Sequence, residues 1–117
     1  SGTNGSGAVI QVVNNSAGTD IGTSLTVTLS AFGSSNNATF GVFGHSANEG
    51  TTFGTGFTEL TDDAINAPNM DLQTEWNSAN DTSVDASWTT SSGNGGFGIE
   101  IKAGGIIPIL AGAYYNE

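Results

Sequence analysis

The sequence predicts an all-β protein, an antiparallel β-sandwich of seven to eight strands with a jelly-roll or immunoglobulin-like arrangement. Short runs alternate between apolar and polar residues, which is the pattern of a strand with one buried face. Clusters of Gly, Asn, Ser and Asp separate these runs at a spacing typical of a sandwich or a barrel. No stretch shows the sustained 3.6-residue periodicity of an amphipathic helix.

Three strands are predicted in the first half of the chain. Residues 8–13 form the first apolar run, and a polar turn cluster follows it. Residues 24–32 alternate regularly between Thr or Ser and larger apolar residues, so one face of this strand is expected to lie in the core. Residues 38–46 carry apolar or small residues on both faces, which is typical of a central strand covered on both sides.

The second half begins with a short strand at residues 57–60. Residues 61–69 are expected to form a loop with room for one helical turn, because Asp, Asn and Pro interrupt the apolar pattern there. Three further runs alternate clearly between apolar and polar side chains, at residues 70–76, 82–90 and 97–103. Each is predicted to be a strand.

The alternation in these last three runs divides their side chains between two faces. The apolar members are expected to face the core, and they include both tryptophans: Met70, Leu72, Trp76, Val84, Ala86, Trp88, Phe97, Ile99 and Ile101. The polar members between them are expected to face solvent: Asp71, Gln73, Glu75, Glu100 and Lys102. Hydrophobicity alone decides this assignment.

The chain is strongly acidic, with eleven Asp and Glu residues against one Lys, and a formal net charge of −10. Nucleic-acid binding needs several cations to neutralise phosphates, and an anionic membrane surface needs the same. The longest apolar run, residues 106–115, is too short for a membrane-spanning helix and contains Pro108. The lack of Cys excludes disulfides and thiolate metal sites. We therefore expect neither a nucleic-acid nor a membrane partner.

One domain is predicted, because 117 residues are too few for two ordinary domains. Residues 1–7 are expected to be a flexible lead-in, residues 8–103 the β-sandwich, and residues 104–117 an apolar segment beyond it. Leu, Ile, Val and Phe together number 25, just above the fraction at which a highly charged chain is expected to stay disordered. Folding therefore depends on directing these few residues into one core.

Four short motifs resemble those of a known group of modules. They are Gly56-Phe57-Thr58-Glu59-Leu60, the run that ends at Trp76, the run from Val84 to Trp88, and Gly98-Ile99-Glu100-Ile101-Lys102. With the pattern of residues 8–103, they are similar to the small jelly-roll or immunoglobulin-like modules of phage and environmental virus structural proteins and of secreted bacterial surface proteins. The resemblance implies a β-sandwich with a structural role. Phe57 stands where these modules usually have Trp, which removes any Trp-based ligand role there.

His45 is the only histidine and the obvious candidate for a general base. A catalytic interpretation pairs it with Ser46 as the nucleophile and with Glu49 or an Asp as the orienting carboxylate. The local sequence Gly-His-Ser-Ala-Asn lacks the G-x-S-x-G nucleophile elbow, and no oxyanion donors can be assigned. A solvated or hydrogen-bonded histidine at a strand end is the favoured interpretation.

Paired carboxylates held roughly 5 to 9 Å apart in a cleft hydrolyse glycosides. The candidates are Glu49, Glu59, Glu75 and Glu100. Glu75 and Glu100 occupy polar positions of alternating strands, where any surface carboxylate lies, and a small sandwich without inserted helices offers little cleft. The sequence therefore predicts a protein that is not an enzyme.

No cofactor is expected, and calcium is the one metal that the composition favours, because Asp and Asn supply its oxygen ligands. The candidate ligands cluster around the predicted loop: Asp62, Asp63, Asn66 and Asp71. Their spacing differs from that of an EF-hand, and Asp and Asn also populate turns for conformational reasons. Both a calcium site and an ordinary turn are open at this point.

A carbohydrate-binding or adhesive module is the alternative function. Such sites stack sugar rings on exposed aromatic side chains, and both tryptophans are expected to be buried instead. Phe32, Phe43 and Phe53 are better placed for exposure, because each lies out of phase or in a loop. Phe53 and Phe57, in the loop of residues 48–57, are the predicted ligand-binding residues.

Residues 104–117 continue beyond the last predicted strand as GGIIPILAGAYYNE. Their large apolar side chains are the predicted subunit contacts: Ile106, Ile107, Ile109, Leu110, Tyr114 and Tyr115. One interpretation is a final strand that folds back on its own sheet; the other is a segment that docks on a neighbouring subunit, by strand addition or by burial of a patch. Burying one Ile or Leu contributes roughly 1.5 to 3 kcal/mol before ordering costs.

These observations predict a non-enzymatic structural subunit of an extracellular assembly. A virion decoration or appendage protein, or a subunit of a surface filament, fits the acidic composition and the apolar segment. Its partners would be copies of itself or neighbouring structural proteins, with a glycan as the alternative partner. The expected location is extracellular or on a virion surface.

Overall fold

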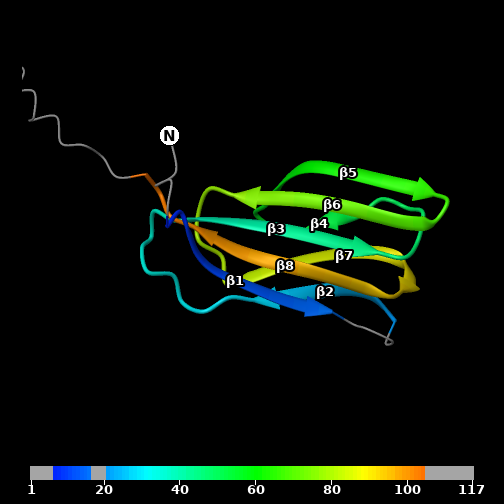
Figure 1. The fold of residues 1–117 in the computed structure, drawn as a ribbon, viewed down its shortest axis with the longest axis horizontal. Coiled ribbons are helices and arrows are strands. Elements are labelled where there is room, and N and C mark those ends of the chain that lie inside the picture. Colours follow the sequence, from blue (N-terminus) through cyan, green and yellow to red (C-terminus); the bar gives the residue numbers. More distant parts are fainter. Residues whose placement is uncertain (1–6, 17–20, 105–117) are drawn as a thin grey trace, which may run out of the picture.

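The computed structural model describes residues 7–16 and 21–104. Within these ranges the chain forms eight strands and no helix, and the strands pair antiparallel in two sheets that face each other (Figure 1). The predicted fold class, an all-β sandwich of seven to eight strands, is confirmed. No helix among the described residues is long and apolar enough to cross a membrane.

The larger sheet has five strands, with β3 at its centre and the sequence-distant strand β8 beside it. In spatial order they are β1 (Val9–Ser16), β8 (Asn94–Ile101), β3 (Ala38–His45), β6 (Asn69–Asn77) and β5 (Thr58–Asn66). The smaller sheet consists of β2 (Gly22–Thr28), β7 (Ser83–Ser92) and β4 (Thr52–Phe53). β8 therefore has a hydrogen-bonded neighbour on each side, β1 and β3.

The loop expected at residues 61–69 is wrong, because β5 continues through most of it. β5 pairs with β6 along its length, with Ala64 opposite Asp71 and Ile65 opposite Met70, and the hairpin turns at Ala67 and Pro68. β5 is an edge strand, and edge strands tolerate charged residues that would break a central strand. The adjacent Asp62 and Asp63 are therefore the reason that the sequence pattern indicated a loop where the structure has a strand.

The hydrophobic core lies between the two sheets. Most of its side chains come from the smaller sheet and its flanking loops: Leu25, Val27, Leu29, Phe43, Phe57, Val84, Ala86 and Trp88. The inward faces predicted for residues 24–32 and 82–90 are confirmed by this set. From the larger sheet, Phe43 is buried in this core and Val13 of β1 packs against it half-buried.

Glycines on the inner face of the larger sheet make room for this core. A Cβ at Gly41 would lie 2.7 Å from Val84 Cγ1, and a Cβ at Gly98 would lie 3.1 Å from Val84 Cγ2 and 3.2 Å from Val27 Cγ1. Gly41 and Gly98 face each other across β3 and β8. Valines of the smaller sheet therefore pack directly onto backbone of the larger one.

The faces predicted for residues 70–76 and 97–103 are wrong, because the larger sheet shows the opposite phase. Lys102, beyond the end of β8, is exposed as predicted, but the other side chains expected to face solvent are fully buried on the inner side of the sheet: Asp71, Gln73, Glu75 and Glu100. The side chains expected in the core lie on its outer side, exposed or half-buried: Met70, Leu72, Trp76, Phe97, Ile99 and Ile101. Trp76 is 40 % exposed, whereas Trp88 is 6 % exposed.

The glycines explain this inversion. Gly41 pairs across the sheet with both Glu75 and Gly98, and paired residues share a face. Since Val84 needs the space above Gly41, the inner face carries the glycines, and Glu75 must join them while Trp76 turns outward. β3 is central as predicted, but the described residues cover only its inner face.

Candidate functional site

The outward side of the five-stranded sheet, called the outer face below, carries many apolar side chains, with Thr74 and the charged Asp63 among them. Side chains from every strand of the sheet contribute to it, and all are exposed or half-buried: Val12, Phe40, Val42, Ile65, Met70, Leu72, Trp76, Phe97 and Ile99. The strand register places Val12, Ile99, Phe40 and Trp76 in one row across four strands. These four apolar side chains are therefore direct neighbours across the sheet.

The outward side of the smaller sheet is the opposite in character. Its exposed side chains are small and polar, among them Ser24, Thr26, Thr28, Ser87 and Thr52. That is the ordinary solvent face of an antiparallel sandwich. Large contiguous apolar patches on soluble domains mark interaction surfaces, so the outer face is the strongest candidate functional site of the described residues.

A groove of about 440 Å³ crosses one end of the outer face. Its lining residues include Met70, Leu72, Gly44, His45 and Asp71. Gly44 pairs with Gly95 on β8 and with Leu72 on β6, so two neighbouring positions lack side chains. The missing side chains leave a recess that a large apolar group of a partner could fill.

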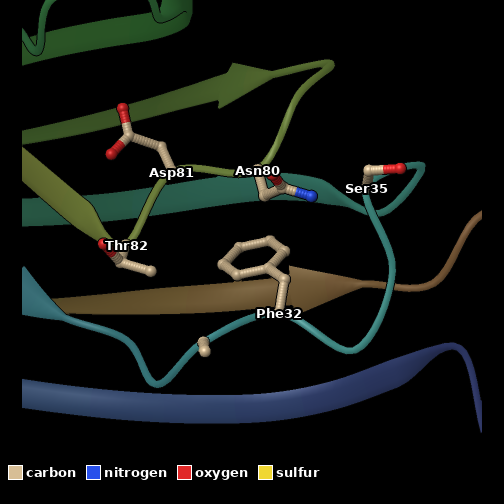
Figure 2. A pocket seen from close by; sticks show the side chains of 6 residues that line it. Phe32, Ser35, Asn80, Asp81 and Thr82 are labelled. Atoms are coloured by element: carbon tan, nitrogen blue, oxygen red, sulfur yellow. The ribbon is translucent and has the colours of Figure 1, made fainter.

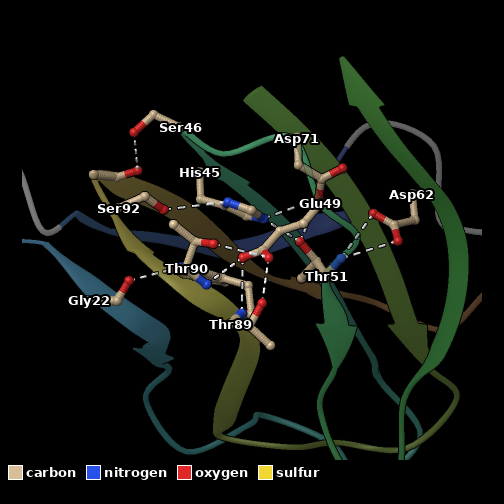
Figure 3. Close-up of polar contacts among 12 residues, drawn as sticks. Gly22, His45, Ser46, Glu49, Thr51, Asp62, Asp71, Thr89, Thr90 and Ser92 are labelled. Carbon is tan, nitrogen blue, oxygen red and sulfur yellow. Dashed lines mark hydrogen bonds and ion pairs between the residues drawn. The ribbon is translucent and has the colours of Figure 1, made fainter. Parts of the chain in front are cut away.

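His45, at the end of β3, is 4 % exposed (Figure 3), and with Asp71 it also lines the groove of the outer face. Its ring stacks on Trp88 with centroids 4.6 Å apart. His45 Nε2 lies 3.1 Å from Thr51 Oγ1, which donates to Asp71 Oδ2, and His45 Nδ1 lies 3.5 Å from Ser92 Oγ. The hydrogen-bonded strand-end histidine is the interpretation that this geometry supports.

Of the partners considered for a catalytic His45, an Asp is present, because Asp71 Oδ2 lies 3.5 Å from His45 Nε2, whereas Ser46 and Glu49 bond elsewhere. Ser46 is exposed, and its Oγ donates to the Gly93 carbonyl at 3.3 Å. Glu49 instead ties its loop to β7, accepting from the backbone N–H groups of Thr89 and Thr90 and from both hydroxyls (Figure 3). The hydrogen bond from the Thr89 hydroxyl, together with the others, holds the pKa of Glu49 below its usual value.

Asp62 lies beside this cluster, on the inward side of β5. Both its oxygens are 3.2 Å from the Thr51 N–H. Burial raises the pKa of the Asp62 carboxyl from 3.8 to about 6, with the Thr51 hydrogen bond opposing the rise and the Asp71 carboxyl adding to it. The folded chain therefore holds a proton on Asp62 more tightly than the unfolded chain does.

We expect Asp62→Asn to flatten the pH dependence of stability between pH 4 and 7. Because the folded pKa is raised, the stabilising protonated form is complete below about 3.8 and is lost as pH rises through about 6. Thermal unfolding should show wild type losing stability from pH 4.5 to 7.5. The variant should gain about 3 °C at pH 7.5, a discounted figure for a partly exposed group.

Asp63→Asn is the matched control, because Asp63 is exposed on the other side of β5 and changes charge equally. An unchanged slope in Asp62→Asn, or an equal flattening in Asp63→Asn, would contradict the assignment of the pH dependence to Asp62.

Glu75 is buried under the loop that carries Gly54. Its Oε2 accepts from the Gly54 N–H at 3.1 Å and from Gln73 Nε2 at 3.2 Å, whereas its Oε1 has no hydrogen-bond partner among the described residues. Burial raises the pKa of Glu75 despite these bonds. Glu59, opposite Glu75 on β5, is exposed, so these two carboxylates do not share a cleft environment.

Glu100 is buried at the other end of the sandwich and is fully bonded. Asn37 Nδ2 and Gln11 Nε2 donate to it at 2.5 and 2.6 Å, and the Gly33 N–H donates at 3.3 Å. Burial acts to raise the pKa of Glu100, and the three hydrogen bonds outweigh it and lower the pKa below its usual value. Glu100 is thus a structural clamp that joins β1, β8 and the residues before β3.

The four predicted calcium ligands are only partly brought together. Asp62 and Asp71 share the inward side of β5 and β6, Asp63 lies on the outward side, and Asn66 sits at the hairpin end, where it accepts from Asn48 at 3.4 Å. Within residues 7–16 and 21–104 no three acidic or His side chains are grouped to hold a metal ion. Calcium prefers six to eight oxygens, so the site stays a prediction.

The predicted aromatic ligand residues separate. Phe57 is buried in the core at 6 % exposure, while Phe53 is exposed on β4. Phe43 is fully buried, so its expected exposure is wrong. Phe32 is half-buried and lines an open pocket of about 460 Å³ with Asn80 and other polar residues (Figure 2). Of the two tryptophans, Trp76 on the outer face is the one exposed enough to stack on a ligand.

Comparison with models of known protein families, with curated proteins and with solved structures finds no match for this chain. The resemblance to modules of virus structural and bacterial surface proteins therefore stays a prediction.

Sequence reasoning missed the outer face and the partners of His45. The missing signal was the pairing register, which sets Asp71 directly opposite His45 and Glu75 opposite Gly41. The available clue was a set of glycines on the inner face, Gly41, Gly96 and Gly98. The six predicted subunit contacts, Ile106 to Tyr115, lie outside the described residues.

Proposed function

We propose that this chain is a non-enzymatic structural subunit of an extracellular assembly, a virion decoration or appendage protein or a surface filament subunit. The observation that carries the proposal is the apolar outer face. An interface core is rich in aromatic residues and Met, and the outer face presents Trp76, Phe97 and Met70, with Asp63 opposite Leu72 as a charged neighbour. Copies of the same chain are the proposed partners.

Apolar burial is the interaction that this chain is equipped to use. With one Lys against eleven acidic residues, complementary charge pairs between identical copies are nearly excluded. Leu72 and Phe97 are each 49 % exposed, so contact with a partner removes apolar surface from water at roughly 25 cal/mol per Å². Salt screens the repulsion between acidic copies, so assembly should strengthen as salt rises.

The non-enzymatic part of the proposal rests on the enclosed polar groups. His45 and Asp71 are both buried although they line the groove of the outer face, and Glu75 and Glu100 point into the sandwich. Acyl transfer and glycoside hydrolysis both require such groups to reach a substrate in a cleft. The acidic composition and the resemblance to virus and bacterial surface modules support the extracellular setting.

The proposal predicts an oligomer that depends on the outer face. Size-exclusion chromatography with light scattering should show the full chain as an oligomer at micromolar concentration. The double variant Leu72→Lys, Phe97→Lys should be at least tenfold weaker in assembly, because it introduces two charges into the contact. The matched control is Thr26→Lys, Ser87→Lys, which adds the same charge to the polar side of the smaller sheet.

The control variant should assemble like the wild type. A wild-type chain that is monomeric at all concentrations and salt conditions would sink the proposal, as would equal weakening by the two double variants.

Carbohydrate binding is kept as the alternative function because of Trp76. Its exposed ring lies on a sheet surface in register with Phe40, a setting that can stack sugar rings. Quenching of tryptophan fluorescence by a polysaccharide panel, abolished by Trp76→Ala, would favour this function. No quenching by any member of the panel would leave the structural role as the sole proposal.

A further inference from the structure

We propose that residues 106–115 of one copy lie on the outer face of a neighbouring copy. This inference rests on the proposed function, and it names the occupant of the face. Three features support it. They are the place where the described chain ends, the length and composition of the residues that follow, and the negative charge that the sandwich of a second copy would bring to the same face.

The described chain leaves the sandwich at a fixed point. After β8, the Lys102 N–H donates to the Ala8 carbonyl at 2.7 Å, and the Ala103 N–H donates to Asn37 Oδ1 at 3.2 Å. These bonds hold residues 102–103 between the starts of β1 and β3, at one end of the sandwich (Figure 1). Residue 104 therefore starts from the sandwich end rather than from the middle of the outer face.

The chain cannot return to the same sheet through a tight hairpin after β8. Gly104 and Gly105 resemble a two-residue hairpin turn, which would place the next residues beside β8. Both sides of β8 are already paired, with β1 and with β3. Residues 106–115 therefore cannot extend this sheet as a hairpin partner of β8.

The length and composition of residues 106–115 suit the outer face. Ten extended residues span about 33 Å, which exceeds the roughly 26 Å of an eight-residue strand, so the segment can cross the whole face. Its apolar side chains match the apolar lining of the face and its groove. Pro108 lacks an N–H and is disfavoured inside a ladder, so burial on the face is favoured over strand addition.

Charge favours residues 106–115, rather than the sandwich of a second copy, as the part of a neighbour that covers the outer face. Ten of the eleven acidic residues lie within residues 1–104, and only Glu117 lies beyond them. Stacking two outer faces would bring two strongly acidic bodies to about the 10 Å spacing of packed sheets, close to one Debye length. Residues 106–115 carry no charge, so they cover the face without that repulsion.

A complementation experiment in the full chain tests the inference. The first variant, Leu72→Lys, Phe97→Lys, has a disrupted outer face and an intact segment. The second, Ile109→Ser, Leu110→Ser, has an intact face and a disrupted segment. Each alone should be monomeric by light scattering, and their mixture should form a complex of twice the monomer mass, because one intact segment meets one intact face. Acrylamide quenching of Trp76 in the second variant should fall at least twofold in the mixture.

The other outcomes are distinguishable. If Ile109→Ser, Leu110→Ser assembles like the wild type, the segment is not the occupant and the inference fails, while the proposed function stands. If the wild type is monomeric, both fail; Trp76 shielded from acrylamide in that monomer would place the segment on its own face. If both variants are monomeric but the mixture gives no complex, docking between copies is excluded.

Discussion

Trp88→Ala is expected to lower the free energy of unfolding by about 3 to 5 kcal/mol, the usual cost of removing a large aromatic side chain from a core. Trp88 is 6 % exposed and packs against the core of both sheets. The variant also loses the stacking contact with His45 and the hydrogen bond from the indole N–H to the Gly22 carbonyl. Urea unfolding followed by circular dichroism measures the effect.

Trp76→Ala is the matched comparison, because the same substitution on the outer face removes an exposed ring. We expect it to cost less than about 1 kcal/mol in the isolated copy. Measurements at two protein concentrations separate any contribution of assembly. Equal losses in the two variants would contradict the inverted phase of the larger sheet.

Gly41→Ala is expected to lower the free energy of unfolding by about 1 to 3 kcal/mol through overpacking. The added methyl would lie 2.7 Å from Val84 Cγ1 and 3.0 Å from Glu75 Cγ, and both of these side chains are fully buried. In a domain of this size the melting temperature should fall by roughly 4 to 8 °C for each kcal/mol. Differential scanning calorimetry measures the shift.

Gly33→Ala is the control for the loss of glycine itself. No heavy atom lies within 4 Å of a Cβ at Gly33. This variant should be neutral or gain up to about 1 kcal/mol, because alanine restricts the unfolded chain. If Gly41→Ala were as stable as Gly33→Ala, the two sheets would have to lie farther apart than the structure places them.

Much of the fold was accessible from local patterns. Strands at 24–32 and 82–90 were predicted with the correct inward face, because each belongs to the smaller sheet, which has a polar outer side. In those two strands the hydrophobic side chains are also the buried ones. In β6 and β8 they are not, since the inner face is occupied by glycines and carboxylates. Only the pairing of Gly41 with Glu75 and Gly98 reveals the phase.

The candidate site was less accessible than the fold. His45 was correctly favoured as a strand-end residue, but its contacts with Asp71 and Ser92 depend on strands far apart in the sequence. The outer face could not be predicted, because its apolar residues were assigned to the core. Knowledge of the register was needed in both cases, and register depends on non-local pairing that no single window of sequence contains.

The position of β8 between β1 and β3 has a mechanical consequence. A pull on residue 104, such as a bound neighbour would exert, acts along the axis of a strand that is bonded to β1 on one side and β3 on the other. Ladder hydrogen bonds lie across the strand direction, so such a force shears both ladders at once instead of opening them one bond at a time. A subunit linked to its neighbours at residue 104 would therefore carry tension along the direction in which its hydrogen-bonded sheet best resists separation of the strands.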